Sequence, residues 1–152
     1  IISRSGYGDT LATLGVSIAF FFIGQITLHA FVLLFRALTS YDDAAEIRGE
    51  NVAAGLSYAG AMIALAVIIG HAADGTFTGW GSSLKSYALA LLVSVALWPV
   101  RQLIVQTILC GGRVSLWKGR LDEGIGRERN VGLGAIEAVT YLATAMVATW
   151  LT

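Results

Sequence analysis

The sequence predicts an all-α membrane protein whose four helices cross the bilayer, leaving almost no chain for a soluble domain. Of the 152 residues, 56% are hydrophobic and only 13% are charged, whereas a soluble domain carries about 25% charged residues. A spanning helix needs about 20 mostly apolar residues, and the chain contains four such stretches. Because a helix satisfies its own backbone hydrogen bonds in lipid, helical spans are expected.

The four stretches together account for nearly the whole chain. They are residues 10–35, 51–73, 86–112 and 130–152. The first two contain no Asp, Glu, Lys or Arg, the third contains only Arg101, and the fourth contains only Glu137. The first stretch exceeds the roughly 7–15 apolar residues of a cleaved signal peptide, so we expect it to be retained. We predict one transmembrane domain over residues 1–152.

Basic residues in the connecting segments predict the orientation. The segments after the first and third spans hold seven basic residues, namely Arg36, Arg48, Arg113, Lys118, Arg120, Arg127 and Arg129. The opposite side holds only Arg4 and Lys85. Because basic loops stay in the cytoplasm, we expect a multi-pass membrane protein with both termini extracytoplasmic.

The segment between the first two spans has the pattern of a helix start. Ser40 is suited to cap a helix, and Asp42 and Asp43 follow it in the position of a first turn. We therefore expect a short helix over residues 43–50. A solvated, charged helix end is the simpler interpretation, and cation binding by Asp42, Asp43 and Glu46 is the alternative.

A shift of 79 residues aligns the chain with itself. Eight of 24 positions are then identical, and the polar ones occur in order at the same helix entrance. The polar matches pair Asp43 with Asp122, Arg48 with Arg127 and Asn51 with Asn130. We expect two tandem two-helix repeats of the same topology, about 8–73 and about 85–152, related by an axis along the membrane normal.

Small residues recur at four-residue spacing in both predicted repeats. Gly55 is followed by Ala59, and Gly134 is followed by Ala138. Such pairs let helix backbones approach closely in lipid, although membrane composition alone also favours them. We interpret both pairs as packing faces, which favours a homo-oligomer or a subunit of a membrane complex.

The segment Glu46-Ile47-Arg48-Gly49-Glu50-Asn51-Val52-Ala53-Ala54-Gly55, with Gly60 and the apolar run after it, resembles the helix entrance of the YjfL-like family. These small bacterial inner-membrane proteins are classed as a domain of unknown function. Members show an acidic residue, a Gly-Asn pair and alternating alanines, often in two units. The resemblance covers both repeats and implies the fold, but it implies no activity.

Arg101 and Glu137 are the most informative residues within the spans. A charge in mid-membrane costs about 2.5–3.5 kcal/mol on insertion scales, so each needs a partner or water. The 79-residue shift places Arg101 on Phe22 and Glu137 on Tyr58, so both charges replace aromatic residues. We expect the two side chains to be neighbours, either as a static ion pair or as part of a proton- or ion-responsive gate.

Two polar pairs share helix faces within the spans. Gln25 and His29 are four residues apart on the first span, and Gln102 and Gln106 are four apart on the third. Interhelical hydrogen bonds are the simpler interpretation, and a polar pathway is the alternative. If Gln102 and Gln106 face a wet cavity, transport is favoured. If they face another helix, a scaffold is favoured.

The sequence names no substrate. Net charge is zero, which argues against a nucleic-acid partner. Phosphate loops, zinc-binding histidine pairs and nucleophile elbows are absent from the sequence, so we predict no enzyme activity, cofactor or metal. We expect a structural or accessory subunit. The alternative is a small channel or transporter that uses Arg101, Gln102, Gln106 and Glu137.

Overall fold

The computed structural model describes residues 10–109, 111 and 119–151, which are helical for most of their length. The helices are α1 (Thr10–Leu38), α2 (Asp43–Arg48), α3 (Val52–Ala72), α4 (Trp80–Ile104), a π-helical continuation of α4 (Val105–Leu109), α5 (Arg120–Gly126) and α6 (Val131–Leu151). No strand occurs in these ranges. The predicted all-α class is confirmed.

Four helices are long and apolar enough to cross a membrane, as predicted. These segments are Ala12–Ala37, Val52–Ala72, Trp80–Ile108 and Val131–Leu151. The third begins at Trp80 and not at Ser86. Lys85 does not interrupt this end of the helix, because its long side chain can place its charge at the membrane interface. Arg4, Arg113 and Lys118, which contribute to the predicted orientation, lie outside the described residues, as does Cys110.

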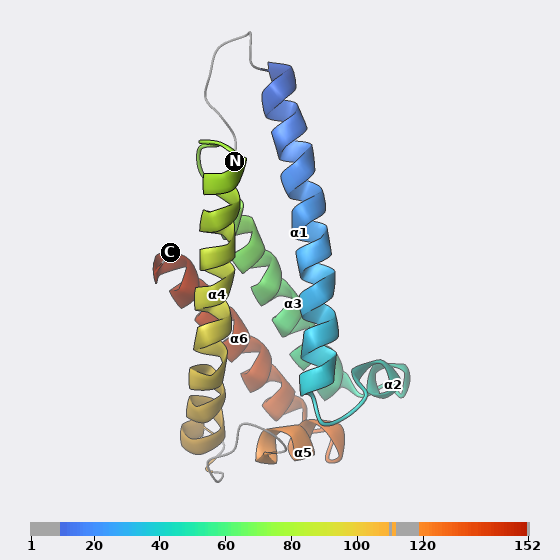
Figure 1. Cartoon of the computed structure of the whole chain (residues 1–152). Helices are drawn as coiled ribbons and strands as arrows, with labels where there is room; N and C mark the ends of the chain where they lie inside the picture. Colours follow the sequence, from blue (N-terminus) through green and yellow to red (C-terminus); the bar gives the residue numbers. More distant parts are fainter. Residues whose placement is uncertain (1–9, 110, 112–118, 152) are drawn as a thin grey trace.

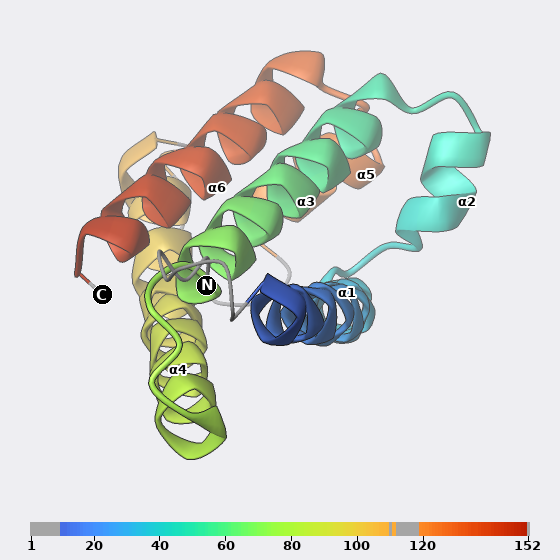
Figure 2. The ribbon, with the colours of Figure 1, turned by 90° about the horizontal axis from the view of Figure 1, so that it is seen from above.

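The spans alternate in direction, and both short helices lie at one end of the bundle. In Figure 1, α1 and α4 run downward while α3 and α6 run upward, with α2 and α5 at the lower end. Viewed from above, α3 and α6 lie side by side (Figure 2). They are parallel neighbours, since Gly134 meets Ala53 near their entrances and Ala138 meets Gly60 farther along.

The contact between α3 and α6 depends on glycine. A Cβ added at Gly60 would collide with the Cα of Ala138, and one added at Gly134 would collide with the backbone of Ala53. Lipid tails are as apolar as leucine, so close backbone packing replaces the hydrophobic effect as the force between spanning helices. These glycines therefore set the separation of α3 and α6.

A compact apolar cluster closes the end of the bundle where α5 lies. Its buried members come from three places: Ala53 and Ala54 on α3, Val105 on the π-helical turn, and Leu121 and Ile125 on α5. The helix α5 is therefore anchored against the spans and does not hang free in solvent.

We expect Gly60→Leu to destabilise the bundle by about 1–3 kcal/mol or more, since overpacking forces helices apart. Gly70→Leu is the matched control on the same helix, because a Cβ added at Gly70 would have no described atom of another element within 4 Å. Thermal unfolding in detergent measures both. Equal losses for the two variants would contradict the role assigned to Gly60.

The orientation can be tested with single cysteines in a Cys110→Ser background. Thr76 is exposed in the α3–α4 connection, and Glu128 is exposed between α5 and α6. We expect an impermeant thiol reagent to label Thr76→Cys in whole cells, and Glu128→Cys only after lysis. The reverse pattern would invert the topology.

Candidate functional site

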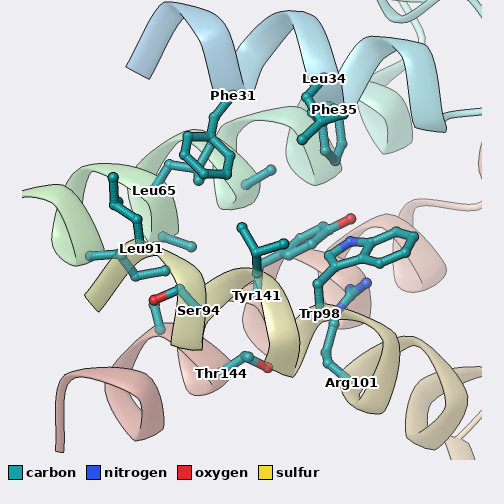
Figure 3. A pocket seen from close by; sticks show the side chains of 15 residues that line it. Phe31, Leu34, Phe35, Leu65, Leu91, Ser94, Trp98, Arg101, Tyr141 and Thr144 are labelled. Carbon is teal, nitrogen blue, oxygen red and sulfur yellow. The ribbon is translucent and has the colours of Figure 1, made fainter. Parts of the chain in front are cut away.

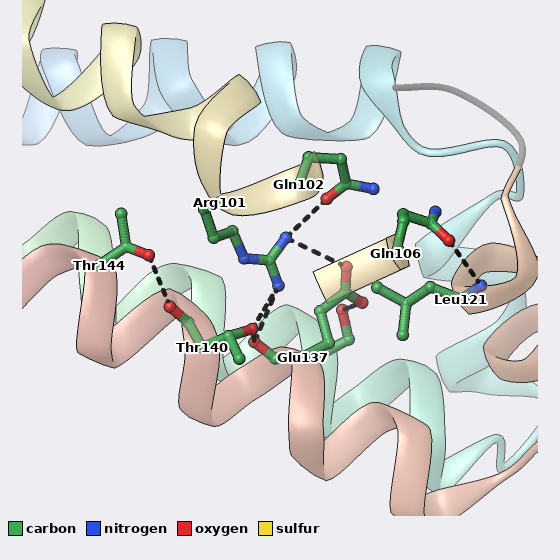
Figure 4. Close-up of polar contacts among 8 residues, drawn as sticks. Arg101, Gln102, Gln106, Leu121, Glu137, Thr140 and Thr144 are labelled. Carbon is green, nitrogen blue, oxygen red and sulfur yellow. Dashed lines mark hydrogen bonds and ion pairs between the residues drawn. The ribbon is translucent and has the colours of Figure 1, made fainter. Parts of the chain in front are cut away.

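A buried polar network links three of the four spans near the end that carries α2 and α5. Arg101 on α4 and Glu137 on α6 are its charged members, with side chains only 4% and 6% exposed. Arg101 Nη1 lies 3.7 Å from Glu137 Oε1. The structure thus brings together the two charges that the sequence singled out (Figure 4).

Arg101 is held mainly by neutral acceptors. Its Nη1 donates to Gln102 Oε1 at 2.8 Å, and its Nη2 donates to the Glu137 carbonyl at 3.1 Å and to Thr140 Oγ1 at 2.8 Å. The guanidinium also lies over the Tyr141 ring, 3.6 Å from its centroid, a favourable cation–π position. The arginine therefore ties α4 to about one turn of α6.

Glu137 extends the network to α3. Ser57 is fully buried on α3, and its hydroxyl donates to Glu137 Oε2 at 2.5 Å. Sequence reasoning missed Ser57, Thr140 and Tyr141, because nothing in their spacing distinguishes them from other small or aromatic residues of a span. Their roles follow from helix rotation, which the sequence pattern does not give.

Gln106 anchors the connection to α5. Its side chain is fully buried, its Oε1 accepts a long bond of 3.5 Å from the Leu121 N–H, and a Cβ at Gly119 would overlap its amide. Its Nε2 has no partner within the described part of the chain. Gln106 thus packs against another helix.

Gln102 borders a small polar hollow. Thr39, Asp122 and Glu137 also line this space, whose volume of about 10 Å³ suits roughly one water molecule. Gln102 Oε1 accepts from Arg101 of the same helix, so of the two glutamines only Gln106 has a hydrogen bond to another helix among the described residues. The space beside Gln102 has room for about one water and is no continuous aqueous route.

Gln25 and His29 lie elsewhere. Both side chains are exposed on α1, and His29 Nδ1 lies 2.7 Å from the Gln25 carbonyl oxygen of the same helix. The prediction of an interhelical hydrogen bond is wrong for this pair. The reason is the rotation of α1, which turns Phe20, Gly24 and Phe35 inward and leaves the Gln25 face outside.

The spanning helices α3 and α6, which begin at the end of the bundle where α2 and α5 lie, start in the same way. Asn51 Oδ1 accepts from the Ala54 N–H, and Asn130 Oδ1 accepts from the Leu133 N–H, both at 3.2 Å. The residues before the asparagines, Glu50 and Arg129, are the non-glycine residues with positive φ among those described, at 60° and 53°. The asparagine cap and the positive-φ residue before it therefore recur 79 positions later in the second entrance.

The two entrances are also bonded to one another. Asn51 Nδ2 donates to the Ile125 carbonyl and to Glu46 Oε2, both at 2.9 Å. Arg129 Nη1 donates to the Gly49 carbonyl at 3.1 Å. The short helices α2 and α5 are therefore parts of one polar collar around the entrances of α3 and α6.

The other charged residues of the repeat motif are divided between buried and exposed positions. Asp43 is buried, and its Oδ2 accepts from Thr39 Oγ1 at 2.8 Å; burial raises the pKa of this carboxyl group. Asp122 is half-buried. Arg48 is exposed, and Arg127 forms an exposed ion pair with Glu123.

The predicted cap of the first short helix needs a correction. Asp42, not Ser40, caps α2, because its Oδ1 accepts from the N–H groups of Ala44 and Ala45 at 3.0 and 3.2 Å. Close by, Tyr41 has its pKa raised by burial and by the negative charge of Glu137 and Asp43. In the ranges that the structure covers, no group of three or more His, Cys, Asp or Glu residues is placed to hold a metal ion.

Residues 9–151 match a family model described as Domain of Unknown Function (DUF350). The chain belongs to the DUF350 family. The match includes both helix entrances and the whole network around Arg101 in this DUF350 chain. No significant match was found among curated proteins or among solved structures.

We expect Arg101→Leu and Glu137→Leu each to destabilise this DUF350 bundle by about 3–5 kcal/mol, because each leaves an uncompensated buried charge. The double variant should recover much of the loss. A double-mutant cycle on unfolding in detergent measures the coupling.

The matched control is the Arg127–Glu123 pair, which is shorter at 2.8 Å but exposed, so its coupling should not exceed about 0.5 kcal/mol. Strictly additive losses for Arg101 and Glu137 would remove the coupling between them.

Proposed function

We propose that this DUF350 protein is a structural or accessory subunit of a bacterial inner-membrane assembly, formed when copies of the chain associate through α3 and α6. The observation that carries the proposal is an unoccupied packing face. Gly134 and Ala138 pack tightly on α3, whereas a Cβ added at Gly55 would have no described atom of another element within 4 Å, and Ala59 is exposed.

The two small-residue pairs are equivalent under the 79-residue shift, yet they are used differently. Gly134 packs on Ala53, while Gly55, two residues beyond Ala53, points about 160° away from it around α3. Within the chain, α6 packs on α3 through Gly134 and Ala138. The equivalent face of α3, formed by Gly55 and Ala59, therefore lies on the outer side of that helix.

The α3 surface on which α6 packs is formed by Ala53 and Gly60. The 79-residue shift places the equivalent surface at Gly132 and Val139 on α6, and both of these residues are exposed. One chain thus presents two repeat-equivalent faces on opposite sides. Val139 stands where the inner contact has Gly60, so the outer contact would be wider than that between α3 and α6. Head-to-tail contacts of this kind generate a closed ring or an extended filament.

This assembly rests on a further proposal, that the chain consists of two same-topology repeats, about 8–73 and about 85–152, of the YjfL-like type. The parallel course of α3 and α6 supports it, as do the paired asparagine caps and the paired positive-φ residues. The axis that relates the repeats would then run along the membrane normal. Both termini would be extracytoplasmic.

The alternative is a small channel or transporter with a polar pathway around Arg101, Gln102, Gln106 and Glu137. The hollow beside Gln102 and Glu137 is the observation in its favour. We favour the non-enzymatic scaffold because Arg101, Glu137 and Gln106 are engaged in contacts between helices. Ion or proton flux into liposomes containing the purified chain would support the alternative.

Cysteine cross-linking in native membranes tests the assembly. In a Cys110→Ser background, we expect the pair Ala59→Cys and Val139→Cys to give a ladder of disulfide-linked species, because each chain then carries one residue of each face. A heterologous contact should extend beyond dimers.

Two controls make the result specific. Each single variant should give no ladder, and the pair Ala96→Cys with Val139→Cys, which joins two exposed positions of unrelated faces, should not cross-link efficiently. Absence of a ladder from the Ala59–Val139 pair, together with a monomeric mass in lipid nanodiscs, would overturn the proposal.

A further inference from the structure

A cavity of about 130 Å³ lies among the four spans, beside Arg101 (Figure 3). Apolar side chains from α1, α3, α4 and α6 form most of its wall, with Arg101 among its few polar residues. Its size is close to that of the roughly 150 Å³ engineered cavity that accepts benzene. It is therefore large enough to take part of a hydrocarbon ligand.

We propose that this cavity binds one acyl chain of a phospholipid from the leaflet on the α2 and α5 side. The ester carbonyl of that chain accepts a hydrogen bond from Arg101 Nε. This lipid site is independent of the proposed assembly, since its lining residues do not include the Gly55 or Val139 faces.

An unused donor supports a ligand with an acceptor oxygen. Both terminal nitrogens of Arg101 have partners, but Nε is buried and has none among the described residues. A buried donor left without an acceptor is destabilising, because it has lost its hydrogen bonds to water and gained none in the protein. Arg101 lines the cavity, but Nε itself is covered, so a small turn of the side chain is needed before a lipid ester supplies the missing acceptor without adding a charge.

The depth of the cavity matches one leaflet. The third span, Trp80–Ile108, has its midpoint at Ser94, and Arg101 lies seven residues closer to the α5 end. That is about 10 Å from the midplane, or about 5 Å inside the hydrocarbon boundary. Leu91, at the other end of the cavity wall on α4, lies about 5 Å beyond the midplane.

The polarity of the cavity therefore follows that of a lipid in this leaflet. The end at Arg101 is the one nearer the ester level of this leaflet, and the apolar end lies near the bilayer centre, where acyl chains end. A polar or anionic small ligand does not suit this cavity, because it would have to pass the apolar mouth before it reached Arg101.

The cavity also has a lateral entrance. Leu34 on α1 and Val95 on α4 line it, yet they remain 45% and 43% exposed. Toward the other membrane face α1 and α4 are joined, since Tyr87 Oη donates to Thr27 Oγ1 at 2.9 Å and Phe20 stacks on Trp80. A lipid chain can thus enter from the bilayer between the diverging helices.

Lipid retention during purification tests the site. Ser94→Leu places a larger side chain in the cavity wall, whereas Ala96→Leu adds a similar volume on the exposed side of the same helix. In native mass spectrometry, we expect the wild type and Ala96→Leu to keep one phospholipid per chain. Ser94→Leu should lose it about tenfold more readily, as excluding about two methylene groups implies.

A second measurement uses the unaltered cavity. Trp98 lines the cavity, so a variant with Trp98 as its only tryptophan reports on the bound chain. We expect phospholipids brominated within the acyl chain to quench Trp98 more strongly than lipids brominated only in the headgroup, and Ser94→Leu to reduce the difference.

A third comparison tests the hydrogen bond to Arg101. Diacyl phospholipids should outcompete dialkyl ether phospholipids of equal chain length by about fivefold to tenfold, because the ether lacks the carbonyl. Equal competition would overturn the contact with Nε. Equal retention of lipid by wild type, Ser94→Leu and Ala96→Leu, or weak quenching of Trp98 by chain-brominated lipid, would overturn the site itself.

Discussion

A guanidinium group in the hydrocarbon region must find acceptors within the protein, and in this chain that requirement falls on Arg101. Its acceptors lie on α4 itself and along α6, and Glu137 passes the connection on to Ser57 of α3. The contact between Ser57 and Glu137 depends on the glycines that let α3 and α6 approach so closely. The buried carboxylate and the glycines are thus linked, since a wider spacing of α3 and α6 would take Ser57 away from a charged group in lipid.

The collar of α2 and α5 depends on the same arrangement. Asn51 can reach the Ile125 carbonyl, and Arg129 can reach that of Gly49, because the entrances of α3 and α6 lie side by side. The positive-φ residues Glu50 and Arg129 turn the chain sharply before each asparagine cap. Such a conformation costs about 1–2 kcal/mol in a non-glycine residue, and the bonds across the collar offset part of that cost.

Much of this architecture follows from the sequence, because lipid imposes simple rules on length and charge. Four apolar stretches of sufficient length predict four spans, and a lone charge in each of two spans indicates that Arg101 and Glu137 need partners. Helix rotation does not follow from such rules. For that reason Ser57 and Tyr141 were missed, and the exposed pair on α1, Gln25 and His29, was assigned a contact with another helix.

Local capping shows the same limit on a smaller scale. Ser40 and Asp42 are both suitable caps by residue type, and only the backbone path decides that Asp42 Oδ1 meets the free N–H groups of α2. In the same way, the sequence shows that Gly55 and Gly134 are equivalent, but not that one is packed and the other open. That difference arises because α6 can fill only one side of α3.

The open side of α3 and the cavity beside Arg101 place different demands on the surrounding bilayer. A close helix–helix face such as that of Gly55 gains from backbone contact, which lipid tails cannot provide. The cavity is bordered by bulky side chains and by helices that diverge, so a flexible acyl chain fills it better than a rigid helix would. The chain thus presents one surface suited to protein, on the open sides of α3 and α6, and a cavity suited to lipid, whose exposed lining residues Leu34 and Val95 lie on α1 and α4. An assembly built through α3 and α6 would leave the mouth between α1 and α4 facing the membrane, so that each subunit would keep access to its own lipid.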